Sequence, residues 1–328
     1  MRQFTNIIWA GTGLLGLVAG LLAARPAGAQ PTPAPAFTVV PLGVRGGLDE
    51  SNLSAYLVAP ASSAAYVCLD AGSLRTGLEK AIASRALTGS ADAVLKQQVK
   101  AYLLSHAHLD HVAGLLLGAP DDSPKPIYGL GNCVQTLQTD YFNWRAWPNF
   151  GNGGVAPALG KYQLRALAPG QALGIPNTTL QVQAFPLSHG PGYESAAFLL
   201  QSNGSYLLYL GDTGADELEH SHHLRELWQA VAPLVQAGQL RGIFFEASYP
   251  NEQPETQLFG HLTPRLLLRE LAALGQLTGP EALRRVPIII THRKPPASQE
   301  AAIARQLAES NRLGVRLLFP VQGQALRL

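Results

Sequence analysis

The sequence has little cysteine and little charge. Its 328 residues include two cysteines, Cys68 and Cys133, which excludes a scaffold built from several disulfides. The sequence leaves open whether these two thiols pair. Only 14% of the residues are charged, and 24 lysines and arginines stand against 22 acidic residues. This balance creates no general positive field, so it argues against a nucleic-acid polymer as partner.

Two further architectures are excluded by composition. Hydrophobic residues make up 47% of the chain, whereas disordered chains are poor in them. No period of about 20–50 residues repeats along the sequence, which excludes a repeat solenoid. The length suits one large domain or two small ones, and no shift in composition marks a second domain.

The first 29 residues have the pattern of a secretory signal peptide. Arg2 supplies a positive start, an apolar run covers residues 7–24, and Ala27-Gly28-Ala29 is a small-residue cleavage motif. An uncleaved membrane anchor is the alternative, because the run approaches spanning length. Glycines interrupt the run, which favours cleavage. We expect export to a periplasm or the cell exterior, without membrane contact after removal of residues 1–29.

A proline-rich tether at residues 30–36 precedes the expected folded domain at 37–328. Apolar, β-rich runs predict strands at 37–40, 55–58, 65–69, 101–104, 180–185, 196–200, 206–210, 243–245, 288–290 and 315–319. Helices are expected at 78–84, 112–117, 218–237, 264–274 and 298–310. This mixture, with several strands buried on both faces, predicts a layered α/β sandwich.

Three histidines and an aspartate follow the expected strand 101–104. They are His106, His108, Asp110 and His111. Neutral imidazole is a common ligand of zinc, and residues two apart on an extended segment point to the same side. The turn beyond the strand can aim Asp110 and His111 at a second metal. A solvated histidine-rich loop is the alternative, but nine histidines spread over the chain do not explain this cluster.

Three more residues of metal-ligand type follow later apolar runs. They are His189, Asp212 and His292. Each by itself is more typical of a capping or hydrogen-bonded polar residue. All three come just after an expected strand, where a sandwich fold gathers its loops at one edge. We therefore expect them to meet the 106–111 cluster.

The 106–111 string with the later His, Asp and His resembles the metallo-β-lactamase superfamily. That resemblance implies a four-layer αββα sandwich. The string with residues 112–115 is similar to class II 3′,5′-cyclic-nucleotide phosphodiesterases, as are the segments 42–47, 52–57, 142–148, 245–249 and 258–264. The similarity runs from about residue 37 to the C-terminus, which implies a catalytic domain at 37–328.

The resemblance implies a site for two divalent metal ions. One is expected on His106, His108 and His189, and the second on Asp110, His111 and His292, with Asp212 bridging both. Zinc is the metal that this histidine-rich set favours, while manganese and iron remain open.

The implied reaction is hydrolysis of 3′,5′-cyclic AMP to the 5′-nucleotide by a metal-bridging hydroxide, and the sequence leaves open whether cyclic GMP is also a substrate. Asp110 is expected to hold the nucleophile or accept its proton. His261 precedes a helix start at Thr263-Pro264, so it is placed to meet an anion and to donate a hydrogen bond or proton. A buried histidine bonded to backbone is the alternative for His261.

Asn143 and Trp144 are candidates for framing the nucleobase, since aromatic faces stack on bases and amides read their edges; loop packing is the alternative. Another hydrolase of the same fold, such as a lactonase or β-lactamase, is the rival enzyme. A non-catalytic secreted nucleotide-binding protein is the rival outside catalysis. The sequence leaves open whether the chain forms a homodimer.

Overall fold

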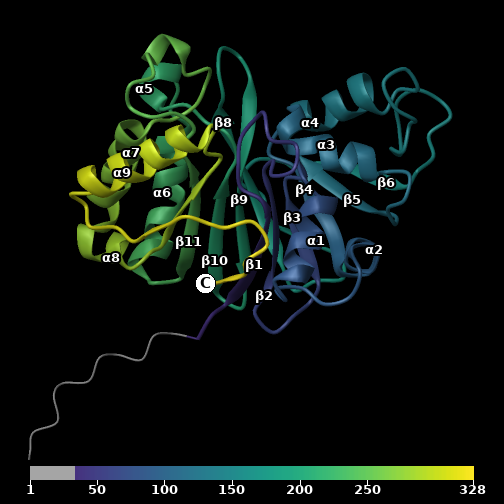
Figure 1. Cartoon of the computed structure of the whole chain (residues 1–328), viewed down its shortest axis with the longest axis horizontal. Coiled ribbons are helices and arrows are strands. Elements are labelled where there is room, and N and C mark those ends of the chain that lie inside the picture. Colours follow the sequence, from purple (N-terminus) through teal and green to yellow (C-terminus); the bar gives the residue numbers. More distant parts are fainter. Residues whose placement is uncertain (1–33) are drawn as a thin grey trace, which may run out of the picture. The chain divides into compact units, whose positions relative to one another are not determined.

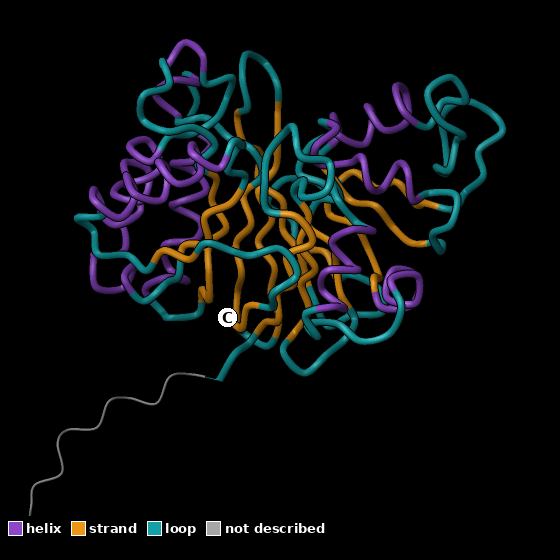
Figure 2. Tube along the Cα trace, in the orientation of Figure 1, coloured by secondary structure: helices purple, strands orange, loops and turns teal. Residues whose placement is uncertain are grey.

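Two seven-stranded sheets lie face to face in the middle of the fold (Figure 1). The structure, a computed structural model, describes residues 34–328. The expected signal peptide and the first part of the tether lie outside the described residues. Helices cover the outer face of each sheet, so the layers run helix, sheet, sheet, helix (Figure 2). The expected four-layer αββα sandwich is confirmed.

The first sheet has the order β14-β1-β2-β3-β4-β5-β6. Its strands are β1 (Phe37–Gly43), β2 (Ala55–Pro60), β3 (Tyr66–Leu69), β4 (Val99–Leu103), β5 (Lys125–Gly129), β6 (Tyr162–Ala166) and β14 (Leu326–Arg327). Its outer face carries α1 (Arg75–Ala83), α2 (Ala91–Ala93), α3 (Leu109–Gly118) and α4 (Gly131–Thr136).

The second sheet has the order β13-β12-β11-β10-β9-β8-β7. Its strands are β7 (Leu173–Gly174), β8 (Gln181–Ser188), β9 (Glu194–Ser202), β10 (Ser205–Leu210), β11 (Leu240–Glu246), β12 (Ile288–Thr291) and β13 (Leu317–Leu318). It is flanked by α5 (Asp216–Glu219), α6 (His223–Gln236), α7 (Pro264–Thr278), α8 (Pro280–Arg284) and α9 (Ala297–Ser310).

Alternating side chains along the strands build three apolar layers. On β1, Val39 lies between the two sheets, whereas Val40 packs toward the helices of the first sheet. On β11, Phe244 lies between the sheets, and Phe245 packs on Trp228 of α6 with ring centroids 5.6 Å apart. Both faces of each sheet are therefore covered, as the continuous apolar strands predicted.

The expected helix at 218–237 is wrong as a single element. The structure divides it into α5 and α6 because His220 takes a left-handed φ of 52°. The carboxylate of Asp216 then accepts hydrogen bonds from the amides of Leu224 and Arg225, at 3.1 and 2.9 Å, and so caps the start of α6.

Strand β5 was not expected from the sequence, because its lysine, proline and glycine are typical of loops. Lys125 is buried there, and its Nζ lies 2.7 Å from Asp122 Oδ1 and 2.6 Å from the Leu95 carbonyl oxygen. A buried charge with such partners is tolerated inside a sheet. Residues 151–160 contain no helix or strand.

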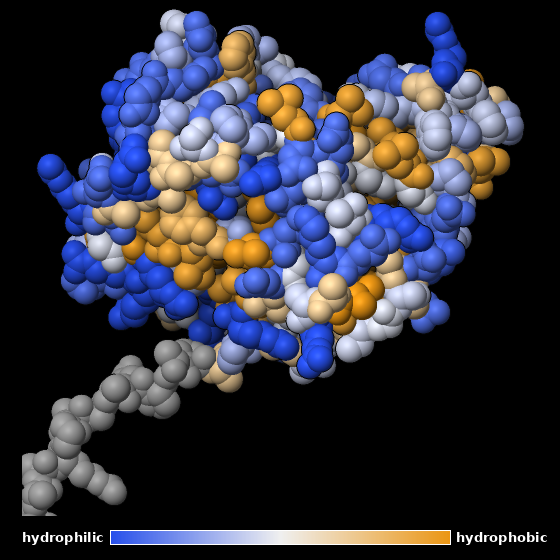
Figure 3. Space-filling view, in the orientation of Figure 1, coloured by the Kyte–Doolittle hydropathy of each residue, from blue (hydrophilic) through white to orange (hydrophobic). Residues whose placement is uncertain are grey.

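Hydrophilic residues cover most of the face shown in Figure 3, with scattered apolar patches between them. Within residues 34–328, no helix has the length and hydropathy needed to cross a membrane.

Candidate metal centre

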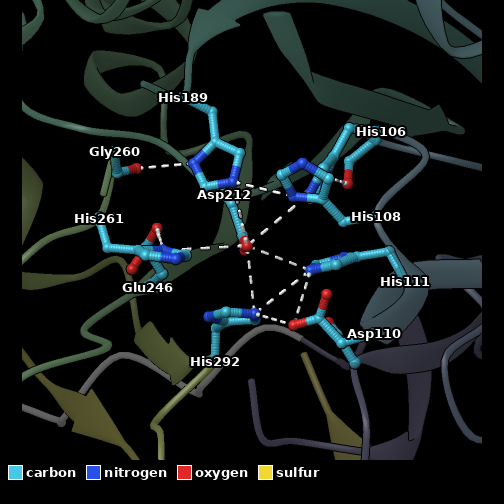
Figure 4. A network of polar contacts seen from close by, with 12 residues as sticks. His106, His108, Asp110, His111, His189, Asp212, Glu246, Gly260, His261 and His292 are labelled. Carbon is cyan, nitrogen blue, oxygen red and sulfur yellow. Dashed lines mark hydrogen bonds and ion pairs between the residues drawn. The ribbon is translucent and has the colours of Figure 1, made fainter. Parts of the chain in front are cut away.

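The seven expected ligands meet where loops leave the strands at one edge of the two sheets (Figure 4). The first sheet supplies four of them: His106 and His108 from the loop after β4, and Asp110 and His111 from the first turn of α3. The second sheet supplies the other three, one each after β8, β10 and β12: His189, Asp212 and His292. The centre therefore joins two halves of the chain.

Three imidazoles form the first group. His106 Nε2 lies 3.1 Å from His108 Nδ1, and His189 Nε2 lies 3.3 Å from the same atom. Asp212 Oδ2 lies 3.8 Å from both His106 Nε2 and His189 Nε2. This is the trio expected for one metal, with Asp212 at its side.

The second group is made of two imidazoles and two carboxylates. His111 Nε2 and His292 Nε2 are 3.2 Å apart. Asp212 Oδ2 lies 3.2 Å from the first of these atoms and 3.1 Å from the second. Asp110 Oδ2 lies 3.1 Å from His292 Nε2. The same Asp212 oxygen lies 3.8 Å from two rings of the first group, so it stands between the two groups, and its bridging of two metals stays a prediction.

Hydrogen bonds behind the rings determine which nitrogens face the centre. His111 Nδ1 lies 2.8 Å from Asp70 Oδ2, and His189 Nδ1 lies 2.8 Å from the Gly260 carbonyl oxygen. Neither oxygen carries a proton to donate, so we assign the proton to Nδ1 in both rings. The Nε2 atoms are left with lone pairs that point inward.

Serine hydroxyls have the same effect on two other rings. Ser105 Oγ donates to Asp70 Oδ2 at 2.8 Å, so its oxygen can accept from His106 Nδ1 at 3.0 Å. Ser248 Oγ contacts the Glu246 carboxylate and lies 2.9 Å from His292 Nδ1. His106 and His292 are thereby also oriented with Nε2 toward the centre.

This donor set fits divalent cations. Two Nε2 lone pairs facing each other at 3.2 Å, as in His111 and His292, repel unless a proton or a cation lies between them. Burial disfavours a charged His111, yet the carboxylates of Asp212, Asp70 and Asp110 together raise its pKa well above the ordinary value. The negative charge of these carboxylates therefore favours a bound proton or cation at this point.

The first group is kept neutral by its surroundings. Burial, reinforced by neighbouring imidazoles, lowers the pKa of His106 well below its ordinary value. Burial also lowers the pKa of His189, to about 4. Burial opposes ionisation of Asp212, but the charges of His111 and His292 outweigh it, so the pKa of Asp212 lies well below its usual range. Neutral imidazoles and an ionised carboxylate are the forms that bind metals.

Backbone without side chains closes around the second group. A Cβ on Gly46 would lie 2.1 Å from His292 Cε1, so only glycine fits beside this ring. The next residue, Gly47, donates its amide to Asp110 Oδ2 at 2.9 Å. His292 itself has a left-handed φ of 54°, a conformation that non-glycine residues adopt at an energetic cost.

His261 lies beside this centre and is paired with a carboxylate. Its Nδ1 is 2.9 Å from Glu246 Oε1 and 3.8 Å from Asp212 Oδ2. Glu246 is buried, and its Oε1 also accepts the Thr213 amide at 2.9 Å. Burial opposes ionisation of Glu246, but His261 outweighs it and lowers the pKa of the carboxyl. The ring is buried, as the alternative expected, but its Nδ1 contacts the Glu246 carboxylate rather than a backbone group, and its part in the reaction stays a prediction.

A family model for class-II cAMP phosphodiesterases matches residues 88–323. This chain belongs to that family. A 3′,5′-cyclic-nucleotide phosphodiesterase of Aliivibrio fischeri is 42% identical over 305 residues, which cover 89% of this chain and 92% of that protein. A probable 3′,5′-cyclic-nucleotide phosphodiesterase of Yersinia pestis is 38% identical over 305 residues, covering 88% and 89%.

Solved structures with low sequence identity to this chain have the same architecture. Unliganded yeast PDE1 matches with a TM-score of 0.79 at 23% identity, covering 90% of this chain and 100% of that one. The metallo-beta-lactamase fold protein YhfI from Bacillus subtilis matches with a TM-score of 0.57 at 15% identity, covering 88% and 99%. The predicted metallo-β-lactamase-like fold is confirmed.

Asn143 and Trp144, the two residues expected to frame the base, lie in the loop that follows α4 and the short π-helix Leu137–Tyr141. The Asn143 side chain serves its own turn: Oδ1 accepts from the amides of Arg145 and Ala146, and Nδ2 donates to the Thr139 carbonyl oxygen. Trp144 is 44% exposed, and its Nε1 donates to the Pro157 carbonyl oxygen at 2.8 Å. Their contact with a base stays a prediction.

Sequence reasoning missed the residues that orient the ligands. Asp70 follows β3 directly, the same signal that drew attention to Asp212 after β10. Glu246 is the last residue of β11. Tyr193 stacks on His108 with ring centroids 4.6 Å apart and an interplanar angle of 10°, and no sequence pattern pointed to it. A polar residue at the end of a buried strand was thus a usable signal for the two carboxylates.

Proposed function

We propose that this protein hydrolyses 3′,5′-cyclic nucleotides, cyclic AMP and cyclic GMP, to 5′-nucleotides. The observation that supports it is the convergence of seven side chains of metal-ligand type, with Asp212 Oδ2 3.8 Å from His106 Nε2 and 3.1 Å from His292 Nε2, in a member of the class-II phosphodiesterase family. Related proteins named 3′,5′-cyclic-nucleotide phosphodiesterase cover nearly the whole chain.

The site would hold two divalent cations, with zinc as the preferred metal. His106, His108 and His189 would bind one, Asp110, His111 and His292 the other, and Asp212 both. Cations there would supply Lewis-acid chemistry, lowering the pKa of water and neutralising phosphoryl charge.

Asp110 is the group best placed to receive the proton of the attacking water. Its side chain is partly exposed, unlike the buried Asp212. The Gly47 amide fixes Oδ2 by a hydrogen bond of 2.9 Å. A carboxylate that is already held in position pays a smaller entropy cost when it receives the proton.

His261 would supply a proton on the other side of the reaction. Attack of water forms a new bond to phosphorus, the bond from phosphorus to the 3′ oxygen breaks, and that oxygen takes a proton. Glu246 Oε1 accepts a hydrogen bond from His261 Nδ1, while Nε2 makes no hydrogen bond within residues 34–328. Nε2 is thus free to donate to the departing oxygen.

We further propose that the protein acts outside the cytoplasm, on the strength of the signal-peptide pattern in residues 1–29. Its partner is then a small extracellular cyclic nucleotide. N-terminal sequencing of the protein recovered from the periplasm or medium should begin at Gln30; a chain beginning at Met1 would contradict this.

The decisive experiment assays the purified exported protein, with its metal content measured. Substrates are cyclic AMP, cyclic GMP, a β-lactam and an acyl-lactone. We expect two equivalents of metal and release of the 5′-nucleotide, with Asp110→Ala losing one metal and most of the activity. Cleavage of the lactam or lactone alone would overturn the proposed substrate.

A further inference from the structure

Three large apolar side chains are exposed on three separate segments that adjoin the metal centre, two turns and the start of α3. Leu48 is 88% exposed, Phe259 69% and Leu109 60%. Leu109 lies between His108 and Asp110 at the first residue of α3. Exposed apolar side chains scattered singly are ordinary in proteins, but these three share their proximity to candidate ligands.

Leu48 belongs to a turn that contacts the second ligand group. Gly46 packs on the His292 ring, and Gly47 donates to Asp110 Oδ2 at 2.9 Å. Gly47 and Leu48 both have left-handed backbones, with φ of 53° and 49°. The leucine is therefore held one residue away from a direct contact with Asp110.

Phe259 belongs to a second such turn, on the side of the first ligand group. Phe259 and Gly260 have φ of 53° and 75°. The Gly260 carbonyl oxygen accepts from His189 Nδ1 at 2.8 Å, and a Cβ on Gly260 would lie 2.3 Å from the Gly190 amide nitrogen. Phe259 is therefore held one residue away from a direct contact with His189.

The stability of the fold does not explain why Leu48 and Phe259 occupy these two positions. A bulky residue in the left-handed region is strained, and asparagine or glycine would adopt the same backbone at lower cost. An apolar side chain that stays in water gains little from packing in return. The same combination is found at Trp144, with φ of 65° and 44% exposure, but there Nε1 is hydrogen-bonded to the Pro157 carbonyl oxygen. Leu48 and Phe259 differ from Trp144 because each stands beside a glycine that contacts the metal centre. Strain of this kind is concentrated at binding sites.

We propose that Leu48 and Phe259, together with Leu109 of α3, bind the nucleobase of the substrate. This rests on the proposed hydrolysis of cyclic nucleotides and adds where the base is held. Phosphate at the metal centre would leave the base near these loops, where apolar side chains can cover its flat faces. Contacts of this kind depend on the area of the base and not on the hydrogen-bonding groups at its edges. We therefore expect similar KM values for adenine and guanine substrates and a higher KM for the smaller cytosine.

The test uses Leu48→Gly and Phe259→Asn, which keep the left-handed backbone and remove the apolar surface. Each should raise the KM for cyclic AMP about tenfold, with the larger part of the loss in KM rather than kcat. Metal content should be unchanged, and the Tm unchanged or higher because the strain is relieved. Arg85→Gly is the matched control: Arg85 is exposed, has φ of 64°, and lies just after α1.

Inhibition by products gives a readout independent of turnover. The wild-type protein should bind 5′-AMP more tightly than ribose 5-phosphate, and the two variants should lose that advantage while binding ribose 5-phosphate as before. Unchanged KM and unchanged inhibition in both variants would overturn the assignment, as would a large KM effect from Trp144→Ser alone. A wild-type protein that cleaves no cyclic nucleotide would refute the proposed function itself.

Discussion

Asp70 holds His111 from behind: Asp70 Oδ2 accepts the Nδ1 proton of the ring across 2.8 Å. The same carboxylate accepts the Ser105 amide at 2.7 Å and the Tyr209 hydroxyl at 2.6 Å. It is fully buried and reaches no substrate-accessible surface. Asp70 therefore fixes the orientation of His111 and raises its basicity, although Asp70 is not itself a candidate ligand.

Replacing Asp70 with asparagine should weaken the second metal position. The amide can present its NH₂ group to Nδ1 and favour the wrong tautomer, so we expect a loss of about 10–100-fold in metal affinity or activity. Metal titration followed by kcat measurement tests this. Asp216→Asn is the control, since Asp216 is hydrogen-bonded at the start of α6. Equal metal affinity in wild type and Asp70→Asn would show that the carboxylate has no such role.

Gly46→Ala should displace His292, because the added methyl carbon would lie 2.1 Å from its ring. A shift of about 1 Å in a catalytic group costs about 100-fold in rate, and we expect at least that loss of kcat together with reduced metal content. Gly118→Ala in α3 is the matched control, as a Cβ there meets no atom within 4 Å. Full activity in Gly46→Ala would contradict the close packing of the ring.

Removing metal with a chelator should lower the melting temperature as well as abolish turnover. The buried carboxylates and facing imidazoles then lose their countercharge. A cation present at about 1,000 times its dissociation constant stabilises the fold by about 4 kcal/mol. Calorimetry with chelator, then with each of zinc, manganese and iron restored, measures the effect and ranks the metals. Identical melting curves in all conditions would rule out a stabilising site.

The thiols of Cys68 and Cys133 should be unreactive in the folded protein. Both are buried and free, and burial raises the pKa of each thiol. A disulfide-exchange reagent should label neither thiol until denaturant is added, and then both. Ser310→Cys, at the exposed end of α9, provides a thiol that reacts at once. Rapid labelling of either native cysteine would contradict the packing around it.

Glu270 on α7 should make stability depend on pH. Burial and the charge of Asp216 raise its pKa, and these effects outweigh Trp228, whose Nε1 donates to Oε2 at 3.2 Å, and Arg269. Because the folded state has the higher pKa, its stabilising contribution is complete below the unfolded value of 4.5 and is lost as the pH rises through the folded pKa.

Glu270→Gln, which resembles the protonated form, should therefore raise the Tm at about pH 7.5 and leave it unchanged at about pH 4. Thermal melts at the two pH values measure this. Glu226→Gln, on the exposed face of α6, is the control. A gain of equal size at both pH values would show that ionisation of Glu270 is not the cause.

The convergence of the seven candidate ligands and the layered fold could be predicted from the sequence because both follow local rules. Metal ligands are restricted to few residue types, and His106 to His111 sit together after an apolar strand. His189, Asp212 and His292 were found by the same placement. The core strands are apolar on both faces, a pattern typical of sheets that are covered on both sides.

The remaining features depend on contacts between distant parts of the chain. Lys125 looks like a loop residue until Asp122 is seen beside it in the folded protein. His220 ends a helix that the apolar pattern would continue. Asp70 orients His111 only because β3 and β4 are neighbours in the sheet. Such partners are set by tertiary packing, and a single sequence carries no direct record of them.

The pairing of β1 with β14 protects one edge of the first sheet. Thr38 and Val39 pair with Arg327 and Leu326, so a segment up to 289 positions further along the chain covers the outer side of β1. Without that segment the backbone N–H and C=O groups of β1 would be unpaired and able to join a strand from another molecule. A variant lacking residues 326–328 should therefore aggregate more readily than the intact protein.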